Sequence, residues 1–493
     1  MEKNLSTNKI ILLLLDQLAV LLFWGGFYRF QFGADTLFRI QMPMGDIGSC
    51  MDHQRYGAYY FLKLLFDLGI NVTDYYRLFF FVYLISIGLC VWLIQLLFLP
   101  FFQTKEKWDL IPLLGMLSIS ALPFFNLLFS ETFMFPEFHI VYALAYLPAT
   151  LGVLALTRSR WVTGILCITL GCLFYQVAVT YAAMLITGWL VMEAGYRLNR
   201  ELVLRVAICD ALIMTIGILD YRSSHWMKAL GLLETTAESK TILPEWTETI
   251  SRFLKSYLLI HKNSMELMPS LWIPLIASLA AIILLSAKLL QEEKGRGIIT
   301  LLLLLATEFL LLAMIPVLSG QICPRITFVF YTMQAILLLG ALSRIRKISW
   351  KRGFAIGCIL YLLIQGFFCQ RIIENRYLSN RLDELYARLV LQQIRLYEEK
   401  TGTQVTQVAI SNDAYAPNSY EEVKYSHDQV NERVLSVSPY LLLEYMNGPE
   451  FQMRHVEMDP EVFDTHFAGK DWDTFDASEQ LVFVDDTLYW CVF

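Results

Sequence analysis

The sequence carries little charge for its length. Only 17% of its 493 residues are Asp, Glu, Lys or Arg, whereas a soluble chain carries about 25%. Hydrophobic residues make up 56% of the chain, and its mean hydropathy is +0.50. Apolar runs of about 20 residues recur, each long enough to cross about 30 Å of hydrocarbon, and the short alternating strands of a membrane barrel are absent. The composition therefore excludes a soluble protein and predicts a polytopic α-helical membrane protein.

Several nucleotide- and metal-binding motifs are absent as well. Neither GxGxxG nor GxxxxGK[ST] occurs, so neither a dinucleotide fold nor a P-loop is predicted, and no pattern points to a nucleic-acid partner. The nine cysteines show no CxxC or Cys/His ligand spacing, so no structural zinc or other metal site is predicted. Cys50 and Cys323 are both expected outside the membrane, and a disulfide between them is left open. No internal repeat or low-complexity linker stands out.

The apolar runs predict eleven membrane spans. Two lysines precede the first run, as in a signal peptide, but the run continues to about Phe27 without a small-x-small cleavage site, so a retained first helix is expected. The stretch 162–194 is interpreted as two spans that meet at Tyr175–Gln176, with one long tilted helix as the alternative. The predicted spans are 9–29, 78–98, 110–129, 138–156, 162–177, 179–194, 204–220, 269–289, 297–317, 324–342 and 352–369.

Basic residues in the short loops predict the orientation. Lysine and arginine gather after the second, fourth, sixth, eighth and tenth spans, and loops of this kind face the cytoplasm. Putting all of them on one side requires the stretch 162–194 to cross twice, and it places the N-terminus inside. The outer segments are then 30–77, 130–137, 221–268, 318–323 and the tail after Gln370.

The chain changes character near residue 370. We predict a transmembrane domain over 1–369 and a small extracytoplasmic α+β domain over 370–493. This domain begins with an amphipathic helix that Thr401-Gly402-Thr403 ends, VTQVAI (405–410) follows as a strand, and two further strands surround an Asp485–Asp486 turn. The apolar face of the helix is assigned to Ile373, Leu382, Leu385, Leu389 and Ile394.

The first outer loop concentrates the groups that can do chemistry outside the membrane. The stretch from Gly33 to Tyr60 holds Asp35, Asp46, Asp52, Arg39, Arg55 and His53. GDIGS (45–49) is typical of a turn, because aspartate beside glycine favours one. A surface helix is predicted after Arg55, with Tyr56, Tyr59, Tyr60 and Leu64 at helical spacing and the tyrosines as interfacial anchors.

Five segments follow one another in an informative order. They are ADTLFR (34–39), QRY (54–56), LPFFNLLFSETF (122–133), the pair Tyr175-Gln176, and MIPVLSGQICPRITFVF (314–330) with its single Arg325. In this order the segments resemble those of the serotype-converting glucosyltransferases of bacterial O-antigen modification, which belong to the GT-C superfamily of membrane glycosyltransferases. The chain departs from that pattern in having one aspartate, Asp35, where the family has a pair, and Gln54 where the family has glycine.

The resemblance implies a GT-C-like fold in a bacterial plasma membrane. It also implies transfer of one sugar, glucose in the named family, from a polyprenyl-phosphate carrier to a surface polysaccharide or other envelope glycan. Such an enzyme needs a carboxylate to take the acceptor proton and cations to stabilise the lipid phosphate. The implied partners are the lipid-linked donor, the glycan acceptor and membrane lipid. No cofactor is required, and a divalent cation is left open because members of the superfamily differ in using one.

The residues are assigned to these roles as follows. Asp35 is the expected general base, with Asp52 as its stand-in and Asp46 as a further candidate. Arg55 and Arg325 are expected to bind the donor phosphate, because a guanidinium presents a planar fork to phosphate oxygens, with headgroup snorkelling as the alternative. Arg39 either joins them or pairs with Asp35 four residues before it. Acceptor or sugar contacts are expected from Glu131, Tyr56, Tyr175 and Gln176; the alternatives are turn or structural roles.

Two other classes of function are carried beside the enzyme. A transporter or flippase for a lipid-linked glycan would favour inverted repeats and paired helix breaks at midplane depth. The odd number of predicted spans, the lack of repeats and the scarcity of charge at midplane depth argue against it. A non-enzymatic envelope scaffold would use the acidic tail as its interaction module. Asp16, within the first span, is a suspect for function because an ionisable group there is costly.

Overall fold

The computed structural model describes residues 2–29, 32–41, 43–102, 109–230, 246–319, 322–412, 433–448, 451–470, 472 and 475–492. Within it the chain forms two compact units. The first unit comprises Met1–Gly26, Met44–Phe133 and Phe138–Gln370. The second comprises Phe27–Pro43, Met134–Glu137 and Arg371–Phe493, so it takes in two short segments that precede the tail by hundreds of residues.

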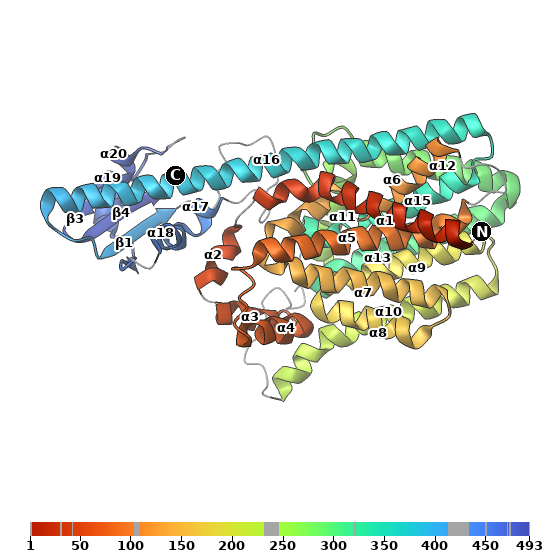
Figure 1. The fold of residues 1–493 in the computed structure, drawn as a ribbon, viewed down its shortest axis with the longest axis horizontal. Coiled ribbons are helices and arrows are strands. Elements are labelled where there is room, and N and C mark those ends of the chain that lie inside the picture. Colours follow the sequence, from red (N-terminus) through yellow and green to blue (C-terminus); the bar gives the residue numbers. More distant parts are fainter. Residues whose placement is uncertain are drawn as a thin grey trace. The chain divides into compact units, whose positions relative to one another are not determined.

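Long apolar helices dominate the first unit, and several run side by side (Figure 1). Among the described residues, eight helices are long and apolar enough to cross a membrane by length and composition, which confirms a polytopic helical membrane protein. They are α1 (Glu2–Trp24), α5 (Tyr76–Phe98), α7 (His139–Thr157), α10 (Arg200–Ala229), α12 (Ile273–Glu292), α13 (Lys294–Ser319), α15 (Phe330–Arg344) and α16 (Ile348–Thr401).

Three shorter apolar helices lie at the other predicted spans, and the number of eleven crossings stays a prediction. They are α6 (Leu110–Ala121), α8 (Trp161–Phe174) and α9 (Val177–Glu193), with 12, 14 and 17 residues. The predicted break is confirmed, because α8 ends at Phe174, Tyr175 is extended and α9 begins at Val177. Helices α7 and α8 pack closely at two glycines: a Cβ built on Gly152 would lie 2.8 Å from the carbonyl oxygen of Gly164. Small residues of this kind let membrane helices approach backbone to backbone.

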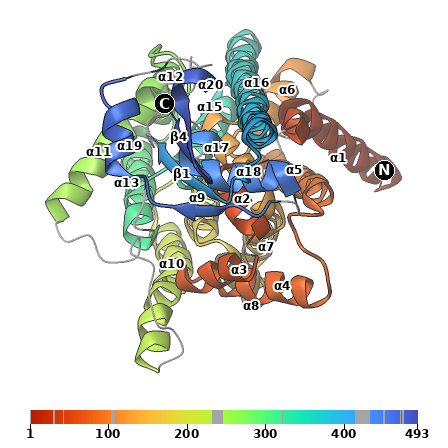
Figure 2. The same ribbon diagram turned by 90° about the vertical axis from the view of Figure 1, so that its left-hand side faces the viewer.

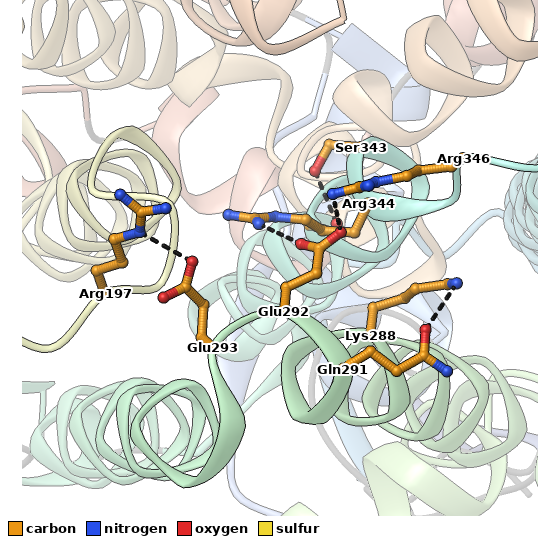
Figure 3. A network of polar contacts seen from close by, with 9 residues as sticks. Arg197, Lys288, Gln291, Glu292, Glu293, Ser343, Arg344 and Arg346 are labelled. Atoms are coloured by element: carbon orange, nitrogen blue, oxygen red, sulfur yellow. Dashed lines mark hydrogen bonds and ion pairs between the residues drawn. The ribbon is translucent and has the colours of Figure 1, made fainter.

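The basic loops meet at one end of the first unit. Arg197, which follows α9, donates to Glu293 at 2.8 Å. Arg344 and Arg346, at and after the end of α15, contact Glu292 at 2.7 and 2.6 Å (Figure 3). Arg352 in the first turn of α16 donates to Asp109 before α6 at 2.7 Å. The loops after the second, sixth, eighth and tenth predicted spans, which the charge pattern assigns to one side of the membrane, therefore lie together; which side that is stays a prediction. We call this the basic end.

Short helices occupy the segments between the spans. They are α3 (Pro43–Asp52), α4 (Tyr56–Asp67), α11 (Trp246–Asn263) and α14 (Pro324–Thr327), with 3₁₀ turns η1 (Gly25–Arg29), η2 (Leu99–Phe101), η3 (Leu127–Met134) and η4 (Pro136–Phe138). The helix predicted after Arg55 is confirmed as α4, which buries Ala58 and exposes Tyr60. The turn predicted at GDIGS is wrong, because 45–49 lies inside α3. Part of the predicted outer segment 221–268, residues 231–245, lies outside the described residues.

The second unit is built on a four-stranded mixed sheet in the order β2-β1-β4-β3. β1 (Gln407–Asn412) runs parallel to β2 (Arg454–Val456) and β4 (Thr487–Val492), while β3 (Leu481–Val484) pairs antiparallel with β4 through the predicted turn, where Asp485 has φ +52°. The remaining elements are α2 (Ala34–Gln41), α17 (Val434–Val437), α18 (Pro439–Asn447), α19 (Pro460–His466) and α20 (Ala477–Gln480); Figure 2 shows β1 beside α18.

The core of the second unit includes residues from the first outer segment. Phe32 and Leu37 are buried in one cluster with Ala387 and Val390 of α16, together with Trp490 of β4. Asn380 donates from Nδ2 to the carbonyl of Phe32 at 3.0 Å. Helix α2, which carries Asp35, is thus packed on the C-terminal part of the chain. The sequence did not indicate this association, which separates α2 from α3 and α4.

The amphipathic helix of the tail forms as the C-terminal part of α16. It ends at Thr401, and Gly402 follows with φ +70°, a conformation that glycine adopts without strain. One residue assigned to its apolar face is wrong, because Leu385 is 50% exposed while its neighbours Tyr386 and Ala387 are buried. The other assignments agree with the structure, since Ile373 and Ile394 are buried and Leu382 and Leu389 are half-buried.

A buried ion pair ties α16 to the segment before α17. Both side chains of Asp383 and Arg433 are 1% exposed, and Oδ1 accepts from Nη2 at 2.6 Å and from Nε at 2.8 Å. The second carboxylate oxygen accepts the N–H of Val434 at 3.1 Å. Because burial removes water from both charged groups, removing either side chain would leave the other as an uncompensated buried charge.

We expect Asp383→Asn to lower the free energy of unfolding by about 3–5 kcal/mol, because it leaves the Arg433 charge buried without its counter-ion. Thermal unfolding of the purified protein in detergent measures this. Arg381→Gln is the matched control: Arg381 pairs with Glu384 but is 55% exposed, so its loss costs at most about 1 kcal/mol. Equal effects of the two substitutions would contradict the interpretation.

Candidate functional site

A buried carboxylate holds Arg325 by its backbone and its side chain together. Glu131 lies in η3 and its side chain is fully buried. Its Oε2 accepts the backbone N–H of Arg325 at 2.7 Å, and its Oε1 accepts from the guanidinium, also at 2.7 Å. The acceptor or sugar role predicted for Glu131 stays a prediction; what the structure gives it is the positioning of Arg325.

The break between α8 and α9 holds the loop that carries Arg55. Gln176 donates from Nε2 to the carbonyls of His53 and Gln54 at 2.9 and 3.1 Å. Gln54 has φ +59°, a backbone conformation that side chains other than glycine seldom adopt. Gln176 thus fixes a sharp turn directly before Arg55, which gives it a structural role; a contact with sugar stays a prediction.

Two arginines converge on Tyr175. The guanidinium of Arg55 lies 5.0 Å from the centre of the Tyr175 ring and 5.3 Å from that of Phe138. The charges of both Arg325 and Arg55 act on the Tyr175 hydroxyl, which is buried. The Tyr175 ring also meets Tyr142 edge to face at 5.2 Å. Aromatic faces hold a guanidinium while leaving its N–H groups available to an anion.

This arrangement, the arginine–tyrosine cluster of Arg55, Glu131, Tyr175, Gln176 and Arg325, has two cations and one carboxylate. Two guanidinium groups in largely buried surroundings can bind an anion such as a phosphate. The cluster lies at the end of the first unit opposite the basic end, because α7, α9 and α15 all begin near it and run to the basic end. The excess of Lys and Arg in the opposite loops predicts the outer side for this end, and that side stays a prediction.

Other predicted residues of the first unit lie around this cluster. Asp52 is the last residue of α3 and is half-buried, three residues before Arg55. Asp46 lies in α3, but its side chain is outside the described residues. The hydroxyl of Tyr56 lies 2.8 Å from Ser223 Oγ of α10. Partial burial raises the pKa of Tyr56, and the Asp220 carboxylate adds to the effect.

Asp35 and Arg39 belong to the second unit. Asp35 is exposed in the first turn of α2. On the buried face of the same helix, Thr36 donates to Glu137 Oε2 at 2.9 Å, and Arg39 Nε lies 3.6 Å from Glu137 Oε1. Glu137, singled out by the sequence only as a flank of a short loop, is thus the carboxylate that anchors α2. The contact of Arg39 with Glu137 gives it a structural role beside the phosphate role predicted for it.

Several acids lie inside apolar helices, among them Asp16, Asp210 and Glu308. Asp16 of α1 accepts from Gln95 at 2.8 Å, and Asp210 of α10 accepts from the Thr187 hydroxyl at 2.8 and 3.0 Å. Glu308 of α13 is fully buried, and within the described part of the chain neither of its oxygens has a hydrogen-bond partner. Only Asp16 was singled out from the sequence; ionisable residues inside apolar runs were the available signal for the other two.

Neither a disulfide bond nor a cluster of metal-binding side chains occurs among the described residues. None of the nine cysteines forms a disulfide bond, so Cys50 and Cys323 are not bridged; both are buried. Among the described residues, no three His, Cys, Asp or Glu side chains gather as a metal site would require.

A double-mutant cycle measures the Glu131–Arg325 contact. We expect Glu131→Gln and Arg325→Gln to show a coupling energy of about 1–3 kcal/mol in thermal unfolding, because the pair is buried and shares two hydrogen bonds. The pair Asp109–Arg352 has the same chemistry with its side chains 20% and 52% exposed, so its coupling should stay below about 1 kcal/mol. Additive effects at Glu131 and Arg325 would show that Glu131 does not hold the arginine.

Comparison with known proteins adds no identity to this geometry. No family model, curated protein or solved structure matches the chain. The function therefore rests on the residues themselves and on the order of segments found in the sequence.

Proposed function

We propose that this chain is a membrane glycosyltransferase of the GT-C type, related to the serotype-converting O-antigen glucosyltransferases. It moves one sugar, glucose by that resemblance, from polyprenyl phosphate to a surface polysaccharide or other envelope glycan. The observation that carries the proposal is the convergence of Arg55 and Arg325 on Tyr175 at the end of the helices opposite the basic loops. In the proposed orientation the cluster lies at the outer membrane surface, just outside the hydrocarbon, where the phosphate of a lipid carrier is located.

The two arginines serve the leaving group. When the bond between the sugar C1 and the phosphate oxygen breaks, the electron pair stays on the phosphate and adds negative charge there. Arg55 and Arg325 stabilise that charge, and because aromatic rings and Glu131 already hold them, little reorganisation is needed as it develops. Glu131 is in this scheme a positioning residue for Arg325.

The acceptor needs a base. As the acceptor oxygen forms its bond to C1, its proton passes to a carboxylate, and Asp35 is the proposed acceptor of that proton. Its carboxylate is open to solvent, while the opposite face of α2 is held by Glu137 and by the core of the second unit. Asp52 remains the stand-in. Neither step needs a nucleotide or another cofactor, and a divalent cation stays open.

The proposed setting follows from the charge pattern. The basic end faces the cytoplasm, the arginine–tyrosine cluster and the C-terminal domain face outward, and the membrane is the bacterial plasma membrane. The second unit then has the role of presenting α2, since Phe32 and Leu37 anchor that helix in its core. A truncated tail would remove the support of Asp35 along with the sheet.

A transporter for a lipid-linked glycan is the second candidate, and one observation favours it. The half-buried Asp210 and the fully buried Glu308 lie within apolar helices long enough to cross a membrane, where such groups often mark proton or ion pathways. The scarcity of midplane charge inferred from the sequence is therefore less complete than expected. Movement of an intact lipid-linked glycan across proteoliposomes that contain no acceptor would favour this candidate over the enzyme.

We expect Asp35→Asn to lower sugar transfer by about 10²- to 10⁴-fold, because the amide cannot take the acceptor proton. The measurement uses the purified protein in proteoliposomes with radiolabelled polyprenyl-phosphate glucose and a lipid-linked polysaccharide acceptor. Asp67→Asn, which changes an exposed aspartate at the end of α4, is the control and should leave transfer unchanged. Full transfer by Asp35→Asn, with loss in Asp52→Asn, would reassign the base to Asp52.

We expect Arg55→Gln to lower kcat by about 10²- to 10³-fold, as the loss of one donor to a developing anion does. Arg55→Lys keeps the charge but loses the fork, so it should recover part of the rate. Arg77→Gln, at an exposed arginine that stacks on Tyr76 at 5.5 Å, serves as the control. An unchanged kcat in Arg55→Gln would leave only the headgroup-snorkelling role.

A further inference from the structure

A long apolar groove lies in the first unit, between α12 and the first part of α16. Its volume is about 940 Å³, at the upper end of the range for small-molecule and lipid sites. Ile276 and Leu284 line one wall, Leu360 and Ile364 line the other, and Leu338 of α15 lies between them. None of these residues belongs to the arginine–tyrosine cluster, so the groove is a separate site.

Two glycines on α16 keep the groove open. Gly353 and Gly357 are one turn apart and both line it. A Cβ built on either of them would meet no atom within 4 Å. The packing of α16 against its neighbours therefore does not require glycine at these two positions. Glycine also lowers the stability of a helix relative to larger residues, so helix stability does not explain it either. The missing side chains leave room for a chain-like occupant along the helix.

The groove runs from an apolar end to a cationic end. It extends from Ile273 to Lys288 along α12, about 22 Å at 1.5 Å per residue. Lys288 and Lys347 line it at the basic end, beside the exposed Trp350. Lys288 donates to the neutral side chain of Gln291 at 3.2 Å, so that contact leaves its charge in place (Figure 3). Tryptophan at this position is typical of the headgroup level of a bilayer.

The basic end of the groove, which we call its mouth, has more positive than negative charges among the described residues around it. The neighbouring acids, Glu292 and Glu293, are already engaged by Arg344, Arg346 and Arg197. The two lysines therefore face the mouth as additional positive charges. A lipid chain in one leaflet spans about half of a core of about 30 Å, and the groove is longer than that.

We propose that this groove binds an anionic diacyl phospholipid, with one acyl chain along Gly353 and Gly357 and the phosphate on Lys288 and Lys347. Charge complementarity selects this occupant. A helix from a second protein would bring its own basic flank to the same side of the membrane and would be repelled there. An anionic headgroup instead neutralises the two lysines. The site is independent of the proposed transfer reaction.

The experiment measures binding of phosphatidylglycerol to the delipidated full-length protein in detergent by native mass spectrometry, with phosphatidylcholine as the neutral comparison. The wild type should bind phosphatidylglycerol at least 10-fold more tightly. The double variant Lys288→Gln/Lys347→Gln should lose about 10- to 30-fold of that affinity, because each lysine near a headgroup contributes about 1 kcal/mol. Gly357→Leu should weaken both lipids by filling the groove.

Matched controls separate the site from general effects. Lys228→Gln/Lys255→Gln removes two charges from exposed positions away from the groove, and Gly295→Leu adds a side chain to another open helical glycine. Both should bind phosphatidylglycerol as the wild type does. Equal binding of the two lipids, loss in the controls as large as in the variants, or a preference for polyprenyl phosphate would overturn the assignment. A groove closed by a second copy of the chain would appear as a dimer that Gly357→Leu dissociates.

Discussion

A backbone group that is shielded from water must find its hydrogen-bond partner within the protein, and the end of the first unit opposite the basic end depends on that constraint. Helices are interrupted there at η3, at Tyr175–Gln176 and at α14, where peptide groups lose their helical partners. Three long polar side chains replace them. Glu131 accepts the N–H of Arg325, Gln365 accepts the N–H of Leu127, and Gln176 donates to two carbonyls before Arg55.

The same side chains that satisfy the backbone also place the arginines. Glu131 binds the guanidinium of the residue whose amide it accepts, and Gln176 holds the turn from which Arg55 reaches Tyr175. A cluster built in this way is stiff, because moving either arginine would uncover a buried peptide group as well as a charge. Stiffness of that kind suits an anion-binding role, where the cost of orienting the donors is met in folding rather than at each turnover.

The sequence was informative where the signal is local. Apolar runs located the helices, the Tyr175–Gln176 pair marked the break between α8 and α9, and Asp485–Asp486 marked the β3–β4 turn. It failed where a contact spans hundreds of residues. Nothing near Phe32 or Leu37 indicates that Ala387 and Val390 cover them, and nothing near Glu137 indicates Thr36. The error at Leu385 has the same origin, because several faces of that helix are apolar and only the partners decide which is buried. Neither the sequence nor the structure identifies the role and the substrate of the arginine–tyrosine cluster, because the geometry of a site gives its charge and shape but not its reaction.

The membership of α2 in the second unit has a consequence for biosynthesis. Leu37 leaves the ribosome 350 residues before Ala387, its neighbour in the core. At 5–20 residues per second, the delay is roughly 20–70 s. During that time the core that covers Leu37 has not been synthesised, so the apolar side chains of α2 lack their native packing partners. Folding of the second unit is therefore completed only after the C-terminal residues have been synthesised. A nascent chain stalled before residue 371 would contain the apolar helices of the first unit but not the core residues that α2 packs against.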